Sequence, residues 1–215
     1  MTTSEPTSNA DATLGEILAD GVVLCVRFRD GERVLDACHA AIRGGLRVIE
    51  ITLTTPDALH AIAELSKVSD VLVGAGTVLS IDDLDAVQSA GGRFALSPVF
   101  DPEVMAEARR RDILAIPGAS TPTEISHAHV NGAGVVKVFP SGALGGPTYL
   151  RAIRGPLAHI PMLPTSGPTS DTMADWFAAG AVAVGVGPEV FPEDFTLEGV
   201  EAAARRVRES VDRGR

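Results

Sequence analysis

A lysine interrupts an apolar run in the segment VVKVFPS, which spans residues 135–141. The chain has 16 arginines but only two lysines, Lys67 and Lys137. Lysine differs from arginine because it can lose its proton and act as a nucleophilic amine. An apolar pocket favours that neutral form, because burial removes water from the ammonium group. Lys137 is therefore a candidate nucleophile that would attack a ketone carbonyl and form a Schiff base.

Polar residues interrupt or follow four other apolar runs: Arg27, Glu50, Thr77 and Thr165. Side chains alternate between the two faces of a strand, so Glu50 shares a face with Val48 and Thr165 with Leu163. In a barrel, inward side chains near the carboxyl ends of the strands meet in one mouth. Glu50 would then move protons on the substrate, while Arg27 and Thr77 would hold an α-keto carboxylate.

The same residues also have purely structural interpretations, which the sequence leaves open. Lys137 and Glu50 could form a buried ion pair, Arg27 could lie on the surface, and Thr77 could be a helix N-cap. We interpret Cys25 and Cys38 as buried structural thiols. Their number and positions do not suggest a disulfide framework, so we expect the protein to function in the reducing environment of the cytoplasm.

Short apolar runs alternate with amphipathic helical patterns along the whole chain. The runs predict strands at Val22–Arg27, Val48–Leu53, Val71–Gly74, Phe94–Ser97, Leu114–Ile116, Val135–Phe139, Ile160–Pro164 and Val182–Val186. The patterns predict helices at Glu32–Arg43, Asp57–Lys67, Ile81–Ala90, Pro102–Arg111, Thr121–Val130, Pro147–Arg154, Thr172–Ala179 and Leu197–Asp212. Strict alternation favours an α/β protein, a single-domain (β/α)8 TIM barrel over residues 13–215. The alternative is an open doubly wound sheet, but no complete glycine-rich phosphate loop follows the first strand.

Composition and charge narrow the classes of function. The net charge of −10 argues against nucleic acid and anionic membranes as partners, because both need a basic surface. No apolar run reaches the roughly 18 residues that span a bilayer. The polar residues 1–12 predict a disordered tail. No His, Cys or carboxylate motif has metal-ligand spacing, so we expect neither a metal nor another cofactor.

Six segments in order resemble the pyruvate-dependent class I aldolases typified by 2-keto-3-deoxy-6-phosphogluconate aldolase and its galactonate counterpart. The resemblance extends from about Leu14 to about Arg208. Its motifs are VIEITL at 48–53, GAGTVL at 74–79, FALSP at 94–98, IPG at 116–118, KVFP at 137–140 and PTSG at 164–167.

The resemblance implies roles for individual residues. Lys137 would form the imine, and Glu50 would be the general acid and base. The keto acid would lie against the substrate-binding residues Arg27, Thr77, Pro98, Phe139 and Thr165. A phosphate would be held by Ser166, Gly167, Gly185 and Gly187. The resemblance also implies a homotrimer. Its expected reaction is the reversible cleavage of a 2-keto-3-deoxy sugar acid, phosphorylated at position 6, to pyruvate and an aldehyde such as glyceraldehyde 3-phosphate.

Two departures from the family pattern bear on the substrate. Thr54 stands where gluconate-type enzymes have a carboxylate-binding arginine, and Arg27 would replace it as in galactonate-type enzymes. The segments Ser166-Gly167 and Gly185-Val186-Gly187-Pro188 lack the family's usual paired glycines and serine. An alternative function is therefore that of an aldolase for unphosphorylated substrates of the 4-hydroxy-2-oxoglutarate type. A phosphate-binding barrel isomerase or transferase, a metal-dependent pyruvate aldolase and a non-catalytic keto-acid-binding protein are further alternatives.

Overall fold

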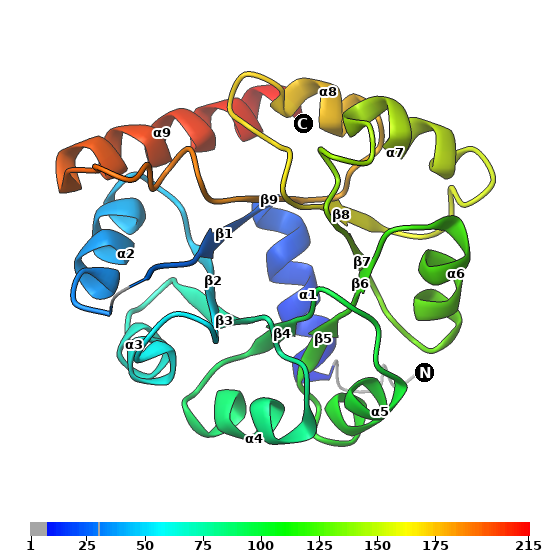
Figure 1. Ribbon diagram of the computed structural model, residues 1–215, viewed down its shortest axis with the longest axis horizontal. Coiled ribbons are helices and arrows are strands. Elements are labelled where there is room, and N and C mark those ends of the chain that lie inside the picture. The colour runs from blue at the N-terminus through cyan, green and yellow to red at the C-terminus, as the bar shows by residue number, and fades with distance from the viewer. Residues whose placement is uncertain (1–7, 30) are drawn as a thin grey trace, which may run out of the picture.

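The computed structural model describes residues 8–29 and 31–215. Parallel strands alternate with helices along the chain, which confirms the predicted α/β class (Figure 1). The described strands are β1 (Val22–Val26), β2 (Val48–Thr52), β3 (Leu72–Gly76), β4 (Phe94–Leu96), β5 (Leu114–Ile116), β6 (Gly118–Ala119), β7 (Val136–Val138), β8 (Met162–Pro164) and β9 (Val184–Val186). The described helices are α1 (Asn9–Asp20), α2 (Val34–Arg43), α3 (Ala58–Leu65), α4 (Ile81–Ser89), α5 (Pro102–Arg110), α6 (Pro122–Val130), α7 (Gly146–Arg154), α8 (Met173–Ala178) and α9 (Leu197–Gly214).

The strands form two parallel sheets that follow one another around a common axis. Six strands pair in the order β5-β4-β3-β2-β1-β9, and three pair in the order β6-β7-β8. Only Pro117 separates β5 from β6, so the predicted fifth strand continues as a second short piece. On the other side, a bridge between Thr165 and Gly185 connects the end of β8 to β9. Figure 1 shows the strands in a ring with α2–α9 outside it.

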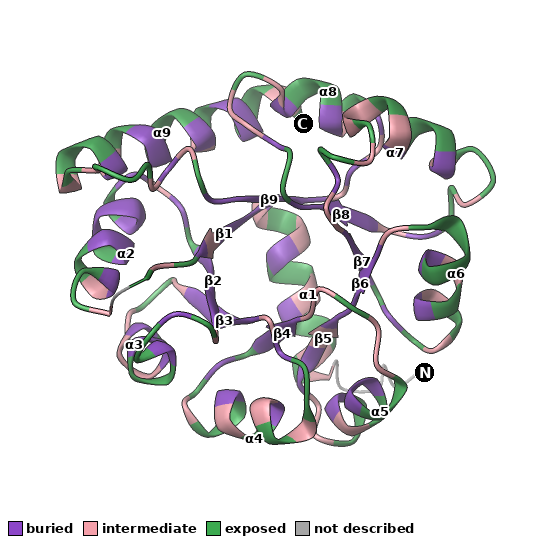
Figure 2. Cartoon of the chain, in the orientation of Figure 1, coloured by how far each residue is buried: buried purple, intermediate pink, exposed green. Residues whose placement is uncertain are grey.

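Two apolar layers hold this arrangement together. The outer layer packs the helices against the strands, and the buried stripe of each helix faces the ring (Figure 2). The inner layer is formed by one or two buried residues from each strand of the ring or directly before it, with β5 and β6 counted as one strand. Ile17 of α1 also belongs to this layer. It consists of Ile17, Val23, Val48, Leu72, Phe94, Leu96, Leu114, Ile116, Val135, Leu163 and Ala183. Since side chains alternate along a strand, residues two further on also point inward.

Helix α1 corrects the predicted disordered tail. Residues 1–7 lie outside the described residues, but residues 9–12 form the first turn of α1 instead of a tail. Ser8 accepts a hydrogen bond from the Asp11 amide, and Asp112 accepts bonds from the Asn9 and Ala10 amides at 2.8 and 3.1 Å. Ile17 is fully buried against the first residues of several strands, so α1 covers the amino-terminal end of the ring. The polar composition of residues 1–12 gives no indication of the contacts between the start of α1 and Asp112.

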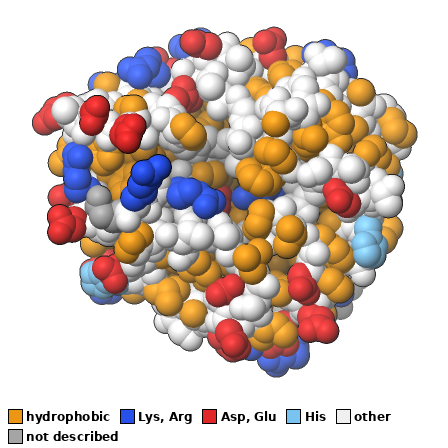
Figure 3. Space-filling model, viewed as in Figure 1, with side chains coloured by type: hydrophobic (Ala, Val, Ile, Leu, Met, Phe, Trp, Pro, Cys, Tyr) orange, Lys and Arg blue, Asp and Glu red, His pale blue; other side chains and the backbone are white. Residues whose placement is uncertain are grey.

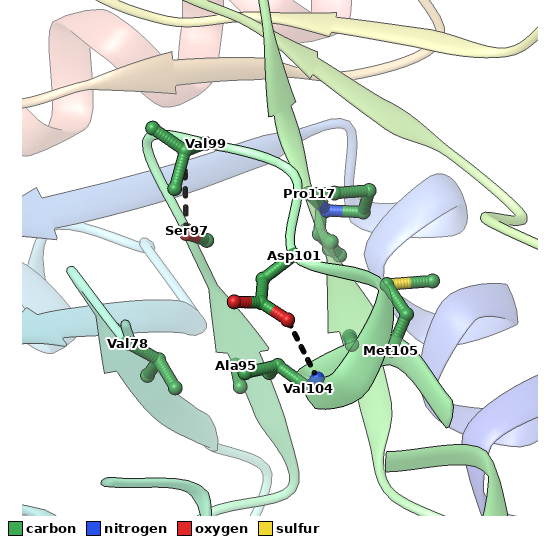
Figure 4. Close-up of a pocket in the computed structure, with 10 residues that line it drawn as sticks. Val78, Ala95, Ser97, Val99, Asp101, Val104, Met105 and Pro117 are labelled. Carbon is green, nitrogen blue, oxygen red and sulfur yellow. Dashed lines mark hydrogen bonds between the residues drawn. The ribbon is translucent and has the colours of Figure 1, made fainter. Parts of the chain in front are cut away.

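A small cavity lies outside the ring between β4, β5 and α5 (Figure 4). Its volume is about 10 Å³, which is about the space of one water molecule. Asp101 faces it and caps α5 by accepting bonds from the Glu103 and Val104 amides. This cavity is a packing feature. No helix in the described part of the chain is long and apolar enough to cross a membrane.

Candidate active site

Lys137 and Glu50 meet inside the ring. Lys137 is the middle residue of β7 and pairs with Gly118 and Leu163 on the neighbouring strands. Glu50 is the middle residue of β2, and the Lys137 Nζ atom lies 3.9 Å from Glu50 Oε1. Their side chains are only 7% and 2% exposed. The two residues thus come from different sheets and share one enclosed space, as strand alternation predicts.

Cys25 lies against Glu50 in this site, a contact that was not predicted from the sequence. It pairs with Glu50 across β1 and β2, and its Sγ donates a hydrogen bond of 2.9 Å to Glu50 Oε2. Burial, followed by the adjacent Glu50 carboxylate, raises the pKa of the Cys25 thiol well above its usual range. The thiol therefore stays protonated and available as a donor. The alternation that groups Cys25 with Arg27 is the sequence signal that places it here.

Arg27 bridges two threonines at the mouth of the ring. Its guanidinium donates hydrogen bonds of 3.2 Å to Thr54 Oγ1 and of 3.2 Å to Thr77 Oγ1. The Arg27 side chain is exposed but turns toward the same end of the strands as the Lys137 site. The arginine thus contacts Thr54 as well as Thr77. A cation flanked by hydroxyl groups is suited to a carboxylate.

Thr77 is not the N-cap of the following helix. Ser80 caps α4 instead, by accepting a bond from the Asp83 amide. Thr77 has a φ of 60°, in the left-handed region that β-branched residues seldom adopt. Such conformations persist where the surrounding structure enforces them, and they gather at functional sites. Here the unusual backbone aims the hydroxyl at Arg27.

The hydroxyl of Thr165 is buried and has no hydrogen-bond partner among the described residues. Most buried hydroxyl groups in proteins are paired, so an unpaired one facing a site indicates room for a ligand. Thr165 follows Leu163 of the inner layer with the same inward direction. It lies against Gly185, where a Cβ atom would approach Thr165 Oγ1 to 2.5 Å.

Phe139 lies beside the lysine, and Pro98 lies beside the neighbouring strand β6. The Phe139 ring centre lies 5.3 Å from Lys137 Nζ, and Ser120 Oγ donates a bond of 2.7 Å to the Phe139 carbonyl. Pro98 packs against Gly118, the strand partner of Lys137, and lines an open groove of about 480 Å³. The structure therefore places both predicted wall residues next to β6 and β7.

Glycines at inward positions provide the space for these groups. A Cβ atom on Gly76 would overlap Glu50 Oε1, and one on Gly74 would approach the Phe94 ring to 2.6 Å. A Cβ on Gly187 would lie 2.7 Å from the Cys25 carbonyl oxygen. Gly76 therefore gives room to the Glu50 side chain, and Gly74 gives room to the Phe94 ring.

The residues predicted to bind phosphate lie around the loops after β8 and β9. Ser166 and Gly167 are exposed, and Ser166 has a positive φ of 63°. Gly185 and Gly187 are buried, and Gly185 pairs with Val23. All four lie on the same side of the ring, near the bridge between Thr165 and Gly185.

The charges of this face are arranged around the mouth. Figure 3 shows a row of Lys and Arg side chains running toward the centre of the face, in the direction of the ring. Among residues 8–29 and 31–215, no group of three or more His, Cys, Asp or Glu side chains could hold a metal ion. The chemistry available from these residues is therefore that of an amine, a carboxylate and hydrogen-bonding groups.

An enclosed lysine beside a carboxylate, inside a ring of parallel strands, is the central feature of this α/β protein. The model of the KDPG and KHG aldolase family matches residues 15–204. The chain belongs to this family of aldolases, and it is therefore a lyase.

Individual relatives agree with this assignment. The chain is 34% identical over 199 residues to the KHG/KDPG aldolase of Escherichia coli K12, covering 91% of this chain and 93% of that relative. It is 39% identical over 151 residues to the 2-dehydro-3-deoxy-phosphogluconate aldolase of Treponema pallidum, covering 68% and 72% of the two chains. The structure of the Legionella pneumophila KDPG aldolase, with pyruvate captured as a covalent carbinolamine, superimposes with a TM-score of 0.82. That pair has 29% identity and covers 91% of this chain and 97% of the other.

Proposed function

We propose that this protein is a class I aldolase that reversibly cleaves a 4-hydroxy-2-oxo acid, such as a 2-keto-3-deoxy sugar acid, to pyruvate and an aldehyde. The observation that carries the proposal is the enclosed pair of Lys137 and Glu50, with Nζ and Oε1 3.9 Å apart. A nucleophilic amine and a proton-transferring carboxylate in one enclosure are the two groups this reaction needs.

The proposed fold is a closed (β/α)8 barrel in one domain. The two sheets contribute eight positions to the ring when β5 and β6 count as one interrupted strand. Pro117 links the sheets on one side, and the Thr165–Gly185 bridge links them on the other. The site lies at the carboxyl ends of the strands, where enzymes of this architecture place their catalytic residues.

The cycle begins when the neutral amine of Lys137 attacks the C2 carbonyl of the substrate. The resulting hydroxyl group leaves as water with a proton from the solvent, which forms a protonated imine; this proton returns to the solvent at the final hydrolysis. Glu50, through a water molecule, takes the proton of the C4 hydroxyl. The C3–C4 bond breaks, its electrons pass to the imine as an enamine, and the aldehyde departs. The enamine carbon gains a proton with the assistance of Glu50, and water hydrolyses the imine to pyruvate and free Lys137.

The substrate's keto-acid half is held by groups around this centre. Arg27 and Thr77 bind the carboxylate, and Thr165, whose hydroxyl lacks a partner among the described residues, donates to the pyruvyl oxygens. Phe139 and Pro98 enclose the imine. We further propose that the protein is a cytoplasmic homotrimer and that it needs no cofactor. Sedimentation would test the trimer, and activity measured with and without a chelator would test whether a metal is needed.

Borohydride trapping tests the reaction. The protein is incubated with pyruvate and sodium borohydride, and the intact mass and the modified peptide are determined. We expect one reduced pyruvyl group on Lys137, and none in Lys137→Arg, which is expected to fold but not to turn over. Lys67→Arg is the matched control, because Lys67 is the other lysine and forms an exposed ion pair with Glu64. It should be trapped as efficiently as the unmodified protein.

Absence of an adduct in folded protein would overturn the aldolase mechanism, and so would aldol activity in Lys137→Arg. Trapping without cleavage of any 4-hydroxy-2-oxo acid would favour a keto-acid-binding protein. The pairing of an amine with a carboxylate argues against that alternative, because binding alone needs no nucleophile.

A further inference from the structure

The loops after β8 and β9 form the distal end of the site. In the proposed barrel these are the seventh and eighth strands, whose loops often hold the phosphate of a substrate. The bridge between Thr165 and Gly185 brings the starts of the two loops together, and Figure 1 shows β8 and β9 next to each other. A phosphate-binding enzyme needs free backbone amides and no competing anion here.

An anion of the protein already occupies hydrogen-bond donors between these loops. The Glu189 carboxylate accepts bonds of 2.9 and 3.1 Å from the Ser170 amide and one of 3.0 Å from Ser170 Oγ. Glu189 comes from the loop after β9 and Ser170 from the loop after β8. The carboxylate therefore connects the two loops and places a negative charge between them.

Other backbone amides near these loops either donate to groups of the protein or are replaced by proline. The Thr165 amide donates to the Val138 carbonyl, and the Thr169 amide donates to Thr172 Oγ1. Pro168 follows Gly167, and Pro188 follows Gly187, and proline has no amide hydrogen to offer. Between Pro168 and Ser170, the loop after β8 therefore has no backbone amide left for a phosphate, because Pro168 has no amide hydrogen and the amides of Thr169 and Ser170 are already bonded.

The position of Glu189 is fixed by a hydrogen-bonded turn. The amides of Val190 and Phe191 both donate to the Gly187 carbonyl, at 2.9 and 3.1 Å. Val190 is fully buried, and the Phe191 ring packs edge-on against Phe28, with the ring centres 5.1 Å apart. The turn fixes the backbone of Glu189, and the three bonds from Ser170 hold its carboxylate between the two loops.

We propose that Glu189 is a specificity-determining residue that excludes a phosphoryl group, so that the enzyme takes an aldehyde half without phosphate. This inference rests on the proposed aldolase function and names the substrate class of the same site. A phosphate monoester carries about −1.5 to −2 charges at pH 7, so it would repel a carboxylate in a partly enclosed site. It would also have to compete with Glu189 for the Ser170 donors.

Aldol addition of pyruvate to two matched aldehydes tests the inference. D-Glyceraldehyde and D-glyceraldehyde 3-phosphate differ only in the phosphoryl group, so the ratio of their kcat/KM values isolates its effect. For the unmodified protein we expect the phosphorylated aldehyde to be no better than the unphosphorylated one. In Glu189→Gln, which keeps the size and removes the charge, the ratio should shift toward the phosphorylated aldehyde by about tenfold or more.

Glu193→Gln is the matched control, because Glu193 is an exposed carboxylate on the same loop and its loss changes the net charge equally. Its ratio should equal that of the unmodified protein. A strong preference of the unmodified protein for glyceraldehyde 3-phosphate would overturn the inference, and this measurement needs no variant. An unchanged ratio in folded Glu189→Gln, or an equal shift in Glu193→Gln, would also overturn it. Borohydride trapping of pyruvate on Lys137 separates these outcomes from a failure of the aldolase function itself.

Discussion

The thiol of Cys25 donates a hydrogen bond of 2.9 Å to the carboxylate of Glu50, and the other oxygen of that carboxylate lies 3.9 Å from the amine of Lys137. A group that is neither nucleophile nor base thus holds one oxygen of the proposed base. The other oxygen is left to face the reacting atoms. Four predictions follow from this geometry and from the residues around it.

Cys25→Ala should lower kcat for aldol cleavage by about tenfold, because Glu50 loses the donor that orients its carboxylate; tenfold corresponds to about 1.4 kcal/mol. The KM for the substrate should change little, since Cys25 has no proposed contact with it. Steady-state kinetics check this split. Cys25→Ser restores a donor and should recover most of the rate, whereas Cys38→Ala, a buried thiol remote from Glu50, should leave kcat unchanged. A Ser variant as slow as the Ala variant would refute a positioning role.

The Cys25 thiol should react slowly with iodoacetamide at pH 8. Only the thiolate is alkylated, and burial together with the Glu50 carboxylate raises the pKa of Cys25, so the thiol stays protonated until the pH is well above 9. Glu50→Gln removes the second cause, lowers the pKa of Cys25 and should increase the alkylation rate at pH 8. The measurement uses mass spectrometry in a Cys38→Ala background. Equal rates with and without the Glu50 charge would contradict the contact.

Arg27→Leu should raise the KM for pyruvate by about ten- to a hundredfold, the effect of losing a hydrogen bond to a charged group. Adding Thr54→Arg to this variant should restore part of the affinity, because Thr54 is hydrogen-bonded to Arg27 and a new guanidinium there would reach the same space. Borohydride trapping at increasing pyruvate concentrations measures both effects. Arg29→Leu removes an exposed arginine two residues further on and should have no effect. If Arg29→Leu raises the KM as much, the effect is one of overall charge.

Gly76→Ala should fold but lose at least a hundredfold in kcat. The new methyl group would overlap Glu50 Oε1, which is the end of a flexible side chain and can move aside at small cost to stability. A displacement of about 1 Å in a catalytic group is enough for a hundredfold loss. Thermal unfolding and steady-state kinetics together check this prediction. Gly15→Ala in α1 is the control, since its Cβ would meet no atom within 4 Å. Full activity in Gly76→Ala would mean that Glu50 is not held at this position.

Much of the architecture is predictable from local patterns. Apolar runs separated by amphipathic stretches predict the strands and helices, and most observed ends lie within two residues of the predicted ones. The helix starts Asp101-Pro102 and Thr121-Pro122 are N-capped as their sequences indicate, and Glu124 completes a capping box with Thr121. The sequence pattern does not predict helix α1, because its large apolar residues are only Leu14, Ile17 and Leu18. The buried one, Ile17, packs against strands that are distant in the sequence.

The order of residues in each strand shows which side chains share a face, because side-chain direction alternates with every residue. Together with the barrel expectation, this alternation predicts that Lys137, Glu50 and Thr165 point into one space. The tertiary structure alone decided the contacts between residues distant in the chain, such as Cys25 with Glu50 and Glu189 with Ser170. Those contacts depend on how neighbouring strands are shifted against each other and on how their loops close. Neither the register nor the loop closure is encoded in the period of a single strand.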